Sequence, residues 1–362
     1  MELPFVGIRR NGRRALLAVA ASAAAASLLR AGSRCKMRGF ATPALRVPML
    51  VGGRCLGATG GSAAVGCLSA PMFSRSWTHP AVVRAASQAT AIDFKHGMGE
   101  AAAAQTTGGM EVALVPCLSD NYAPLLHDRS TGATATVDTP DAGCILAALE
   151  ARGWTLTHVL NTHHHLDHTG GNEELKRCTG CQIIGPASEA ARIPGLDVAV
   201  ADGDQISVGR FVAKVLDVGG HTAGHIAYHF SGQNAAFVGD ALFVLGCGRI
   251  FEGTPAQMWE SLQKIRSLPD DTVVYCAHEY TQSNARFAKH LGGVPGLEDR
   301  LVAIDDLRSN GKATVPMLLG HEKVTNPFLR ADTDAIREAT GLAAGTPAVQ
   351  VFAKVRSMKD RF

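Results

Sequence analysis

The sequence predicts a mixed α/β domain that extends to about residue 280 and is followed by a small helical domain. From Met110 onward, short apolar runs rich in β-branched residues are each bounded by Gly, Asp, Asn or Pro, as strands are. Helical patterns lie between some of these runs. After Tyr280 the strand patterns cease and only helical patterns follow.

The individual elements follow from the same two patterns. In chain order, the expected strands are Val112–Pro116, Ala133–Asp138, His158–Asn161, Gln182–Ile184, Phe211–Val218, Ile226–Phe230, Ala235–Val238 and Thr272–Cys276. The expected helices are Ala142–Ala151, Gly171–Arg177, Pro255–Leu268, Ser283–Leu291, Leu297–Leu307, Thr333–Thr340 and Ala348–Lys359.

Charge divides the chain into a basic leader and an acidic body. Residues 1–90 hold twelve of the 35 Lys and Arg residues but only one of the 32 acidic residues, Glu2. The remainder has 23 basic and 31 acidic residues, a net charge of −8. This balance argues against nucleic acid as a partner, and against a nuclease, which would need a basic channel.

The leader, residues 1–100, has the composition of a targeting segment. It is rich in Arg, Ala, Ser and Gly and nearly free of acids. The apolar run Ala15–Leu29 is too short for a comfortable membrane span, so we expect no stable membrane insertion of the mature protein. A mitochondrial presequence leading to the matrix is the first interpretation. A two-part leader to a plastid-type organelle and a cytosolic product from an internal start are the alternatives.

The body is expected to comprise an α/β domain at 110–280 and a helical domain at 281–362. Its six cysteines are scattered and do not indicate a disulfide scaffold. Cys178 and Cys181 form a CxxC, but a zinc ribbon needs a second pair. We interpret this CxxC as a surface or packing feature, with a redox role as the alternative. A monomer is expected.

A cluster of candidate metal ligands follows the expected strand His158–Asn161. The sequence there is Thr-His-His-His-Leu-Asp-His, residues 162–168. In an extended segment alternate residues share a face, so His163, His165 and Asp167 can converge while His164 turns away. Imidazole and carboxylate donors suit zinc, iron or manganese.

Three more candidates come directly after strand-like runs further along the chain. They are His221 in Gly-Gly-His-Thr, Asp240 after Phe-Val-Gly, and His278 before Glu-Tyr. The ends of strands are where α/β folds place functional loops. With His168, the clusters supply seven ligands, enough for two metal ions that share one carboxylate.

In this order the motifs resemble the metallo-β-lactamase superfamily. More specifically, the sequence is similar to glyoxalase II, the hydroxyacylglutathione hydrolases, through nearly all of residues 113–362. The blocks that carry this resemblance are Val115–Tyr122, Gly170–Asn172, Gly239–Phe243, Gly246–Arg249, Phe251–Thr254, His278–Thr281 and Asn326–Phe328. It implies an αββα sandwich with the site at one edge. Residues 110–280 would then be the metal-binding catalytic domain, and 281–362 the helical domain that binds glutathione.

The resemblance also assigns roles to individual residues. His163, His165 and His221 would hold one metal, Asp167, His168 and His278 the other, and Asp240 both. Asp240 and Asp167 would be the catalytic residues, whereas His164, His225 and His229 match no ligand position. Phe251 stands where some relatives carry Tyr. The implied glutathione-binding residues are Arg249, Ile250, Phe251, His278, Glu279, Tyr280, Arg356, Ser357, Met358 and Lys359.

The resulting expectation is a thioesterase that converts S-D-lactoylglutathione to glutathione and D-lactate, the second step of methylglyoxal detoxification. Two divalent ions, zinc first, would lower the pKa of a bridging water and supply hydroxide as the nucleophile. A thiolate leaves readily, so a strong general acid is unnecessary. The alternatives are a glutathione persulfide dioxygenase with one iron and a catalytically silent binding module of the same fold.

Overall fold

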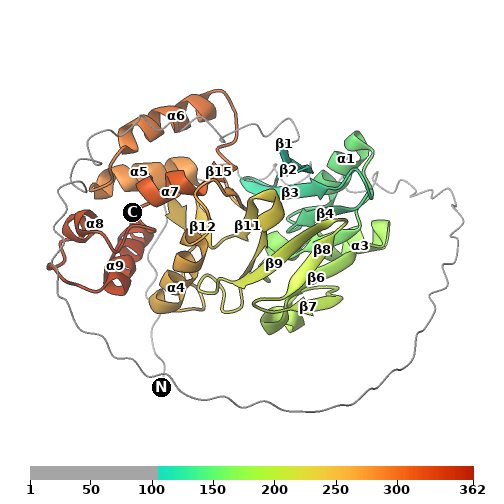
Figure 1. The fold of residues 1–362 in the computed structure, drawn as a ribbon, viewed down its shortest axis with the longest axis horizontal. Coiled ribbons are helices and arrows are strands. Elements are labelled where there is room, and N and C mark those ends of the chain that lie inside the picture. Colours follow the sequence, from blue (N-terminus) through green and yellow to red (C-terminus); the bar gives the residue numbers. More distant parts are fainter. Residues whose placement is uncertain (1–104) are drawn as a thin grey trace, which may run out of the picture. The chain divides into compact units, whose positions relative to one another are not determined.

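The structure is a computed structural model that describes residues 105–362; the predicted leader, 1–100, lies outside the described residues. Two β-sheets form its centre (Figure 1). The first sheet has the strand order β1-β2-β3-β4-β5-β6-β7, with β1 (Gln105–Thr107), β2 (Met110–Cys117), β3 (Asn121–His127), β4 (Thr134–Val137), β5 (His158–Leu160), β6 (Gln182–Pro186) and β7 (Val198–Val200). The second has the order β15-β14-β11-β10-β9-β8, with β8 (Gln205–Val208), β9 (Phe211–Asp217), β10 (Ile226–Phe230), β11 (Ala235–Gly239), β14 (Val273–Cys276) and β15 (Met317–Leu318).

Short strands β12 (Leu242–Phe243) and β13 (Gly246–Cys247) form a separate pair. The helices lie between strands in the first two thirds of the described chain and follow one another near its end. They are α1 (Ala142–Arg152), α2 (Leu166–Thr169), α3 (Asn172–Thr179), η1 (Ala187–Arg192), η2 (Ser231–Gln233), α4 (Pro255–Arg266), α5 (Thr281–Leu291), α6 (Leu297–Ser309), α7 (Leu319–Thr325), α8 (Asp334–Ala339) and α9 (Ala348–Asp360).

Alternation along β2 explains how the first sheet is covered on both faces. Val112 and Leu114 belong to the main core, which also holds side chains of the second sheet. Ala113 and Val115 point the other way and pack in a second core with Ile145 of α1. The predicted sandwich of two sheets with outer helices, followed by a helical region, is confirmed.

Seven of the fifteen strands within the described residues were not expected; they are β1, β3, β7, β8, β12, β13 and β15. Within β3, Pro124 stands in a strand that pairs with neighbours on both sides, where proline is uncommon. Of the residues of β3, only Leu125–His127 pair with β4. The missing N–H of Pro124 therefore removes no hydrogen bond between β3 and β4. β15 lies within the region expected to be helical, where Met317 pairs with Val274 of β14.

The domain boundaries stay a prediction. Strand β1 lies in the interval between the predicted leader and the predicted start at Met110, and pairs antiparallel with β2. Among the described residues, no helix has the length and apolar character needed to cross a membrane.

One disulfide is present in the described part of the chain. Cys117, at the end of β2, is bonded to Cys144 in the first turn of α1. Their sequence spacing did not indicate it; the two meet because α1 packs against β2. Cys178 and Cys181 are not bonded, and Cys181 is buried in the second core.

Candidate metal centre and substrate pocket

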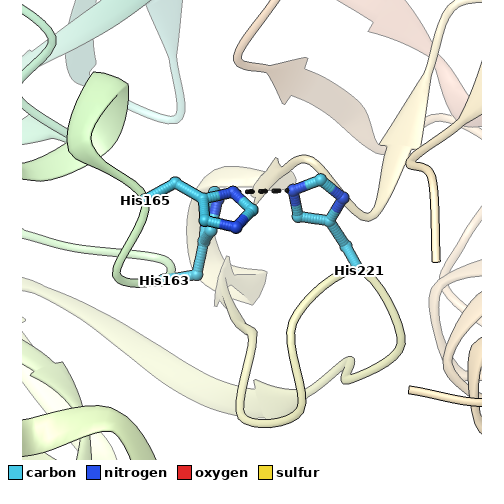
Figure 2. A group of neighbouring side chains, drawn as sticks. All are labelled: His163, His165 and His221. Atoms are coloured by element: carbon cyan, nitrogen blue, oxygen red, sulfur yellow. Dashed lines mark hydrogen bonds between the residues drawn. The ribbon is translucent and has the colours of Figure 1, made fainter. Parts of the chain in front are cut away.

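Three histidines converge where loops of the two sheets meet. His163 and His165 follow β5, and His221 lies in the loop between β9 and β10. Nδ1 of His165 lies 3.0 Å from Nε2 of His163 and 3.1 Å from Nε2 of His221. Figure 2 shows the three rings turned toward one another. Zinc with Zn–N bonds of about 2.0–2.1 Å places neighbouring nitrogens roughly 3.3 Å apart, which these spacings approach.

A second group contains Asp167 and His168 of α2 and His278, which follows β14. Nε2 of His278 lies 3.3 Å from Nε2 of His168 and 3.4 Å from Oδ2 of Asp167. The expectation that Asp167 continues an extended segment is wrong, because α2 begins one residue before it. The helical turn brings two consecutive residues to the same group.

Asp240 lies between the two groups, directly after β11. Its Oδ2 is 3.4 Å from Nε2 of His221, whereas its Oδ1 is 3.4 Å from Nε2 of His278 and 3.5 Å from that of His168. Oδ1 is buried and has no hydrogen-bond partner among the described residues. A buried carboxylate oxygen that faces imidazole nitrogens fits a cation as its partner. The seven residues therefore fit a metal-binding site.

Hydrogen bonds to the outer ring nitrogens orient three of these histidines. In each case Nδ1 donates to an oxygen, so that Nε2 is directed toward the cluster. The three bonds, each 2.8 Å long, join His168 to Asp138, His278 to Asp120 and His221 to the carbonyl of Arg249.

Asp138 and Asp120 are supporting residues that the sequence patterns did not single out. Asp138 is buried and also accepts the N–H and hydroxyl hydrogen bonds of Thr162, each 2.8 Å long. It follows strand β4 directly. A carboxylate just after a strand is the pattern that identified Asp240, and the same pattern could have identified Asp138.

Electrostatics keep most of the cluster in the ionisation states of metal ligands. Burial, together with neighbouring histidines, lowers the pKa of His163 well below its ordinary value and leaves the ring neutral. The hydrogen bond from His278 lowers the pKa of Asp167. For His168, burial opposes protonation, but the carboxylates of Asp240 and Asp138 outweigh it and raise its pKa to about 9. The same negative charge favours a divalent cation.

The three histidines that match no ligand position differ in their surroundings. The ring of His225 stacks on His163, with centroids 4.6 Å apart, and its Nε2 accepts the backbone N–H of Asp240 at 3.1 Å. His164 turns away from the cluster, as expected, and contacts Glu189. His229 lies half-buried on β10, away from these groups.

The cluster opens onto a pocket of about 490 Å³. Four of its metal-ligand candidates, His165, Asp167, His221 and His278, line this pocket together with Asp240. The other lining residues come from β12 and the segment after it, from α5 and the residue before it, and from α9 and the residues after it. They are Phe243, Cys247, Arg249, Phe251, Tyr280, Ser283, Asn284, Arg356, Lys359, Asp360 and Phe362.

Six of the ten predicted glutathione-binding residues therefore line the pocket, and four do not. Glu279 points to another cavity, where it accepts hydrogen bonds from the Tyr122 hydroxyl at 2.9 Å and from Thr314. Ile250 and Met358 pack against the core. The hydroxyl of Ser357 accepts a bond from Arg361.

The cationic side chains of the pocket differ in how firmly they are held. Arg356 is buried and donates to the carbonyl of Cys247 and to Asp360, both at 2.9 Å. Lys359 donates to Ser283 through Nζ, at 2.9 Å to the hydroxyl. The side chain of Arg249 is 64% exposed and lies 3.9 Å from Asp360, so it has the most freedom to meet a ligand.

Comparison with known proteins identifies the family. Residues 111–278 match the model of the metallo-beta-lactamase superfamily, and residues 279–362 match that of the hydroxyacylglutathione hydrolase C-terminus. The chain is 53% identical to the hydroxyacylglutathione hydrolase of Methylococcus capsulatus over 254 residues, which cover 70% of this chain and 99% of the relative. The hydroxyacylglutathione hydrolase of Rhodospirillum rubrum is 50% identical over 254 residues, which again cover 70% of this chain and 99% of the relative.

The chain belongs to the hydroxyacylglutathione hydrolases. Among solved structures, ETHE1 from Myxococcus xanthus is 26% identical, with a TM-score of 0.48, and the match covers 68% of this chain and 97% of that one. In this chain, all seven candidate ligands lie in residues 111–278, the part that matches the superfamily model. Tyr280, Arg356 and Lys359 lie in the part that is specific to the family.

Proposed function

We propose that this chain hydrolyses S-(2-hydroxyacyl)glutathione, with S-D-lactoylglutathione as the substrate, to glutathione and D-lactate. The observation that carries this proposal is the position of Asp240: it lies between two groups of candidate metal ligands and lines a pocket that also holds Arg249, Arg356 and Lys359. One end of the pocket therefore suits hydrolysis, and the cations suit an anionic peptide.

We further propose two divalent ions, zinc in the first instance. His163, His165 and His221 would hold one ion, Asp167, His168 and His278 the other, and Asp240 both. Ions bound there would polarise the thioester carbonyl and lower the pKa of water enough to supply hydroxide at neutral pH.

The protein's own groups bind the substrate and orient the reacting end. Arg249 and Lys359 provide cations for the carboxylates of the peptide. Phe251 and Tyr280 line the pocket, and both contact histidines of the candidate metal site. The ring of Phe251 lies edge-on to that of His165, and the ring of Tyr280 stacks on that of His278 with centroids 4.7 Å apart. Asp240 is placed to accept a proton near the scissile bond. The thiolate product leaves without a proton donor because its pKa is about 8.5.

The test is a thioester assay combined with metal analysis on one purified sample. We expect loss of S-D-lactoylglutathione absorbance with release of one free thiol per turnover, in protein that holds two ions per chain. Oxygen uptake with glutathione persulfide, by protein that holds one iron, would favour the dioxygenase instead. Lack of both activities in metal-loaded protein would favour a silent binding module.

Lys359 gives the proposed substrate binding a defined pH dependence. Burial, followed by the charges of Arg356, Arg286 and Arg249, lowers its pKa from 10.5 to about 8. Lys359 is therefore a cation below pH 8 and loses its charge as the pH rises through 8, which weakens its attraction for a carboxylate. We expect KM for S-D-lactoylglutathione to rise roughly three- to tenfold between pH 7 and 9.5, given ~1.5 kcal/mol for one screened charge-assisted bond.

Two variants isolate this effect. Lys359→Arg keeps the charge, so its KM should change little over the same range. Lys359→Met should have a high KM at both pH values. A small thioester that lacks the peptide should show no such rise with wild-type enzyme. An equal rise with both substrates, or in Lys359→Arg, would assign the pH dependence to another group.

We also propose that residues 1–100 direct the protein to the mitochondrial matrix and that the mature enzyme is a monomer. The support is the Arg-rich, nearly acid-free composition of the leader. Fusion of residues 1–100 to a fluorescent reporter should give a mitochondrial signal; a plastid or uniform cytosolic signal would contradict this. Sedimentation of the mature enzyme tests its oligomeric state.

A further inference from the structure

His164 lies between two candidate ligands but faces the opposite way. Its backbone N–H and its Nδ1 both contact Oε2 of Glu189, at 2.9 and 2.7 Å. On the other edge of the ring, Nε2 lies 3.6 Å from Oε1 of Glu252 and has no hydrogen-bond partner among the described residues. Only 6% of the side chain is exposed. The imidazole is thus buried between two carboxylates.

The same two carboxylates hold the loop that carries His221. Oε1 of Glu189 accepts the N–H of Gly224 at 2.9 Å, and Oε2 of Glu252 accepts the N–H of Ala223 at 3.0 Å. The backbone of Gly224 packs closely against Ser188, because a Cβ at residue 224 would lie 2.0 Å from the Ser188 hydroxyl oxygen. The loop is therefore fixed through its backbone, two and three residues after His221.

Glu252 also connects this loop to the pocket wall. The N–H of Phe251, its neighbour, donates to the carbonyl of His221 at 3.1 Å, and Nδ1 of His221 donates to the carbonyl of Arg249. Arg192 of η1 donates to Oε1 of Glu252 at 2.6 Å. A displacement of Glu252 would thus be transmitted to His221 directly.

Ligand atoms of His164, Glu189 and Glu252 lie within 4.8 Å of one another, a spacing that could hold a metal ion. All four carboxylate oxygens already accept N–H groups, from Gly224, from His164, from Arg192 and from Ala223. The arrangement bridges two loops instead.

We propose that His164 is a positioning residue that holds His221 in place against His163 and His165. It does so through its hydrogen bond to Glu189 and its packing 3.6 Å from Glu252, which together we call the bridge. The proposal rests on the proposed metal centre. It concerns only one of the two ligand groups, because the other is oriented by residues that the bridge does not touch. Asp138 orients His168, Asp120 orients His278, and Asn121 donates to Asp167. Loss of the bridge should therefore weaken one metal ion and spare the other.

Two conservative variants of the full chain separate the two edges of the ring. In His164→Asn the amide can still reach Glu189, but nothing faces Glu252; in His164→Gln the longer amide can face Glu252. Chelator-stripped protein is titrated with Zn²⁺ against a chromophoric chelator, and the unfolding temperature of the stripped protein is recorded. His229→Gln, a half-buried histidine on β10, is the matched control.

We expect His164→Asn to bind one equivalent of Zn²⁺ 10- to 100-fold more weakly, the range found when residues that support metal ligands are replaced. The affinity for the second equivalent of Zn²⁺ should stay within threefold of the wild-type value. His164→Gln should recover part of the affinity that His164→Asn loses for the first equivalent. KM should change little, while kcat falls. Glu252→Gln should weaken the same equivalent.

Two results would overturn the proposal: unchanged binding of both equivalents, or equal loss of both with a lower unfolding temperature of the stripped protein. Failure of the proposed function would look different, because the wild type itself would then bind fewer than two equivalents or hydrolyse no thioester.

Discussion

Replacement of Asp240 by alanine is expected to lower kcat by roughly a thousandfold or more, equivalent to at least ~4 kcal/mol of transition-state stabilisation. Its two carboxylate oxygens face different ligand groups, Oδ2 toward His221 and Oδ1 toward His168 and His278. Both proposed ions therefore lose a ligand. Metal analysis of the purified variant should give fewer than two ions per chain.

Two companion variants control this experiment. Asp240→Asn keeps the size of the side chain but removes the charge, so it should also lose metal and activity while the protein stays folded. Asp305→Ala removes an exposed carboxylate on α6 and should leave both unchanged. If Asp240→Ala retained two ions per chain, the assignment of Asp240 as the shared ligand would be wrong.

The largest expected loss of stability comes from the buried pair formed by Arg300 of α6 and Glu322 of α7. Both side chains are fully buried, and they are hydrogen-bonded to each other. Glu322 also accepts the backbone N–H of Leu245 at 2.8 Å, in the turn between β12 and β13. Arg300→Met would leave a buried carboxylate without its cation, which lowers the free energy of unfolding by about 3–5 kcal/mol.

Urea unfolding, followed by circular dichroism, measures that change. The double variant Arg300→Met/Glu322→Gln should lose less than the sum of the two single losses, since no uncompensated charge remains. The exposed pair of Lys289 and Glu298 is the control, and Glu298→Gln should change stability by less than ~1 kcal/mol. A loss below ~1 kcal/mol in Arg300→Met would contradict the prediction.

The metal cluster could be predicted because its residues follow strands. His163, His221, Asp240 and His278 each lie within a few residues of a strand end, and a sandwich brings such ends together. Asp167 was identified for a partly wrong reason. An extended segment and a short helix present different residues on one side. Helix α2 was not predicted, because it begins at Leu166, an apolar residue that is 77% exposed and so gives no helical pattern of buried apolar residues.

The pocket was predictable only in part. Arg356 and Lys359 lie three residues apart on α9, so helical spacing alone placed them on one face. No spacing rule fixes the direction of a side chain in a turn, and Glu279 turns away from its neighbours His278 and Tyr280. Its partners, Tyr122 and Thr314, come from distant parts of the chain, and so this contact depends on the tertiary structure.

The candidate metal ligands and the cations of α9 lie in different parts of the sequence, so they are synthesised at different times. The seventh candidate ligand, His278, is synthesised before every residue of α9, and at ~5–20 residues per second the 70 residues from His278 to Ala348, where α9 begins, take about 4–14 s. Throughout that interval the nascent chain carries all seven candidate ligands but lacks Arg356 and Lys359. A chain interrupted in this interval would therefore have the candidate metal ligands without the α9 cations that we propose bind the peptide.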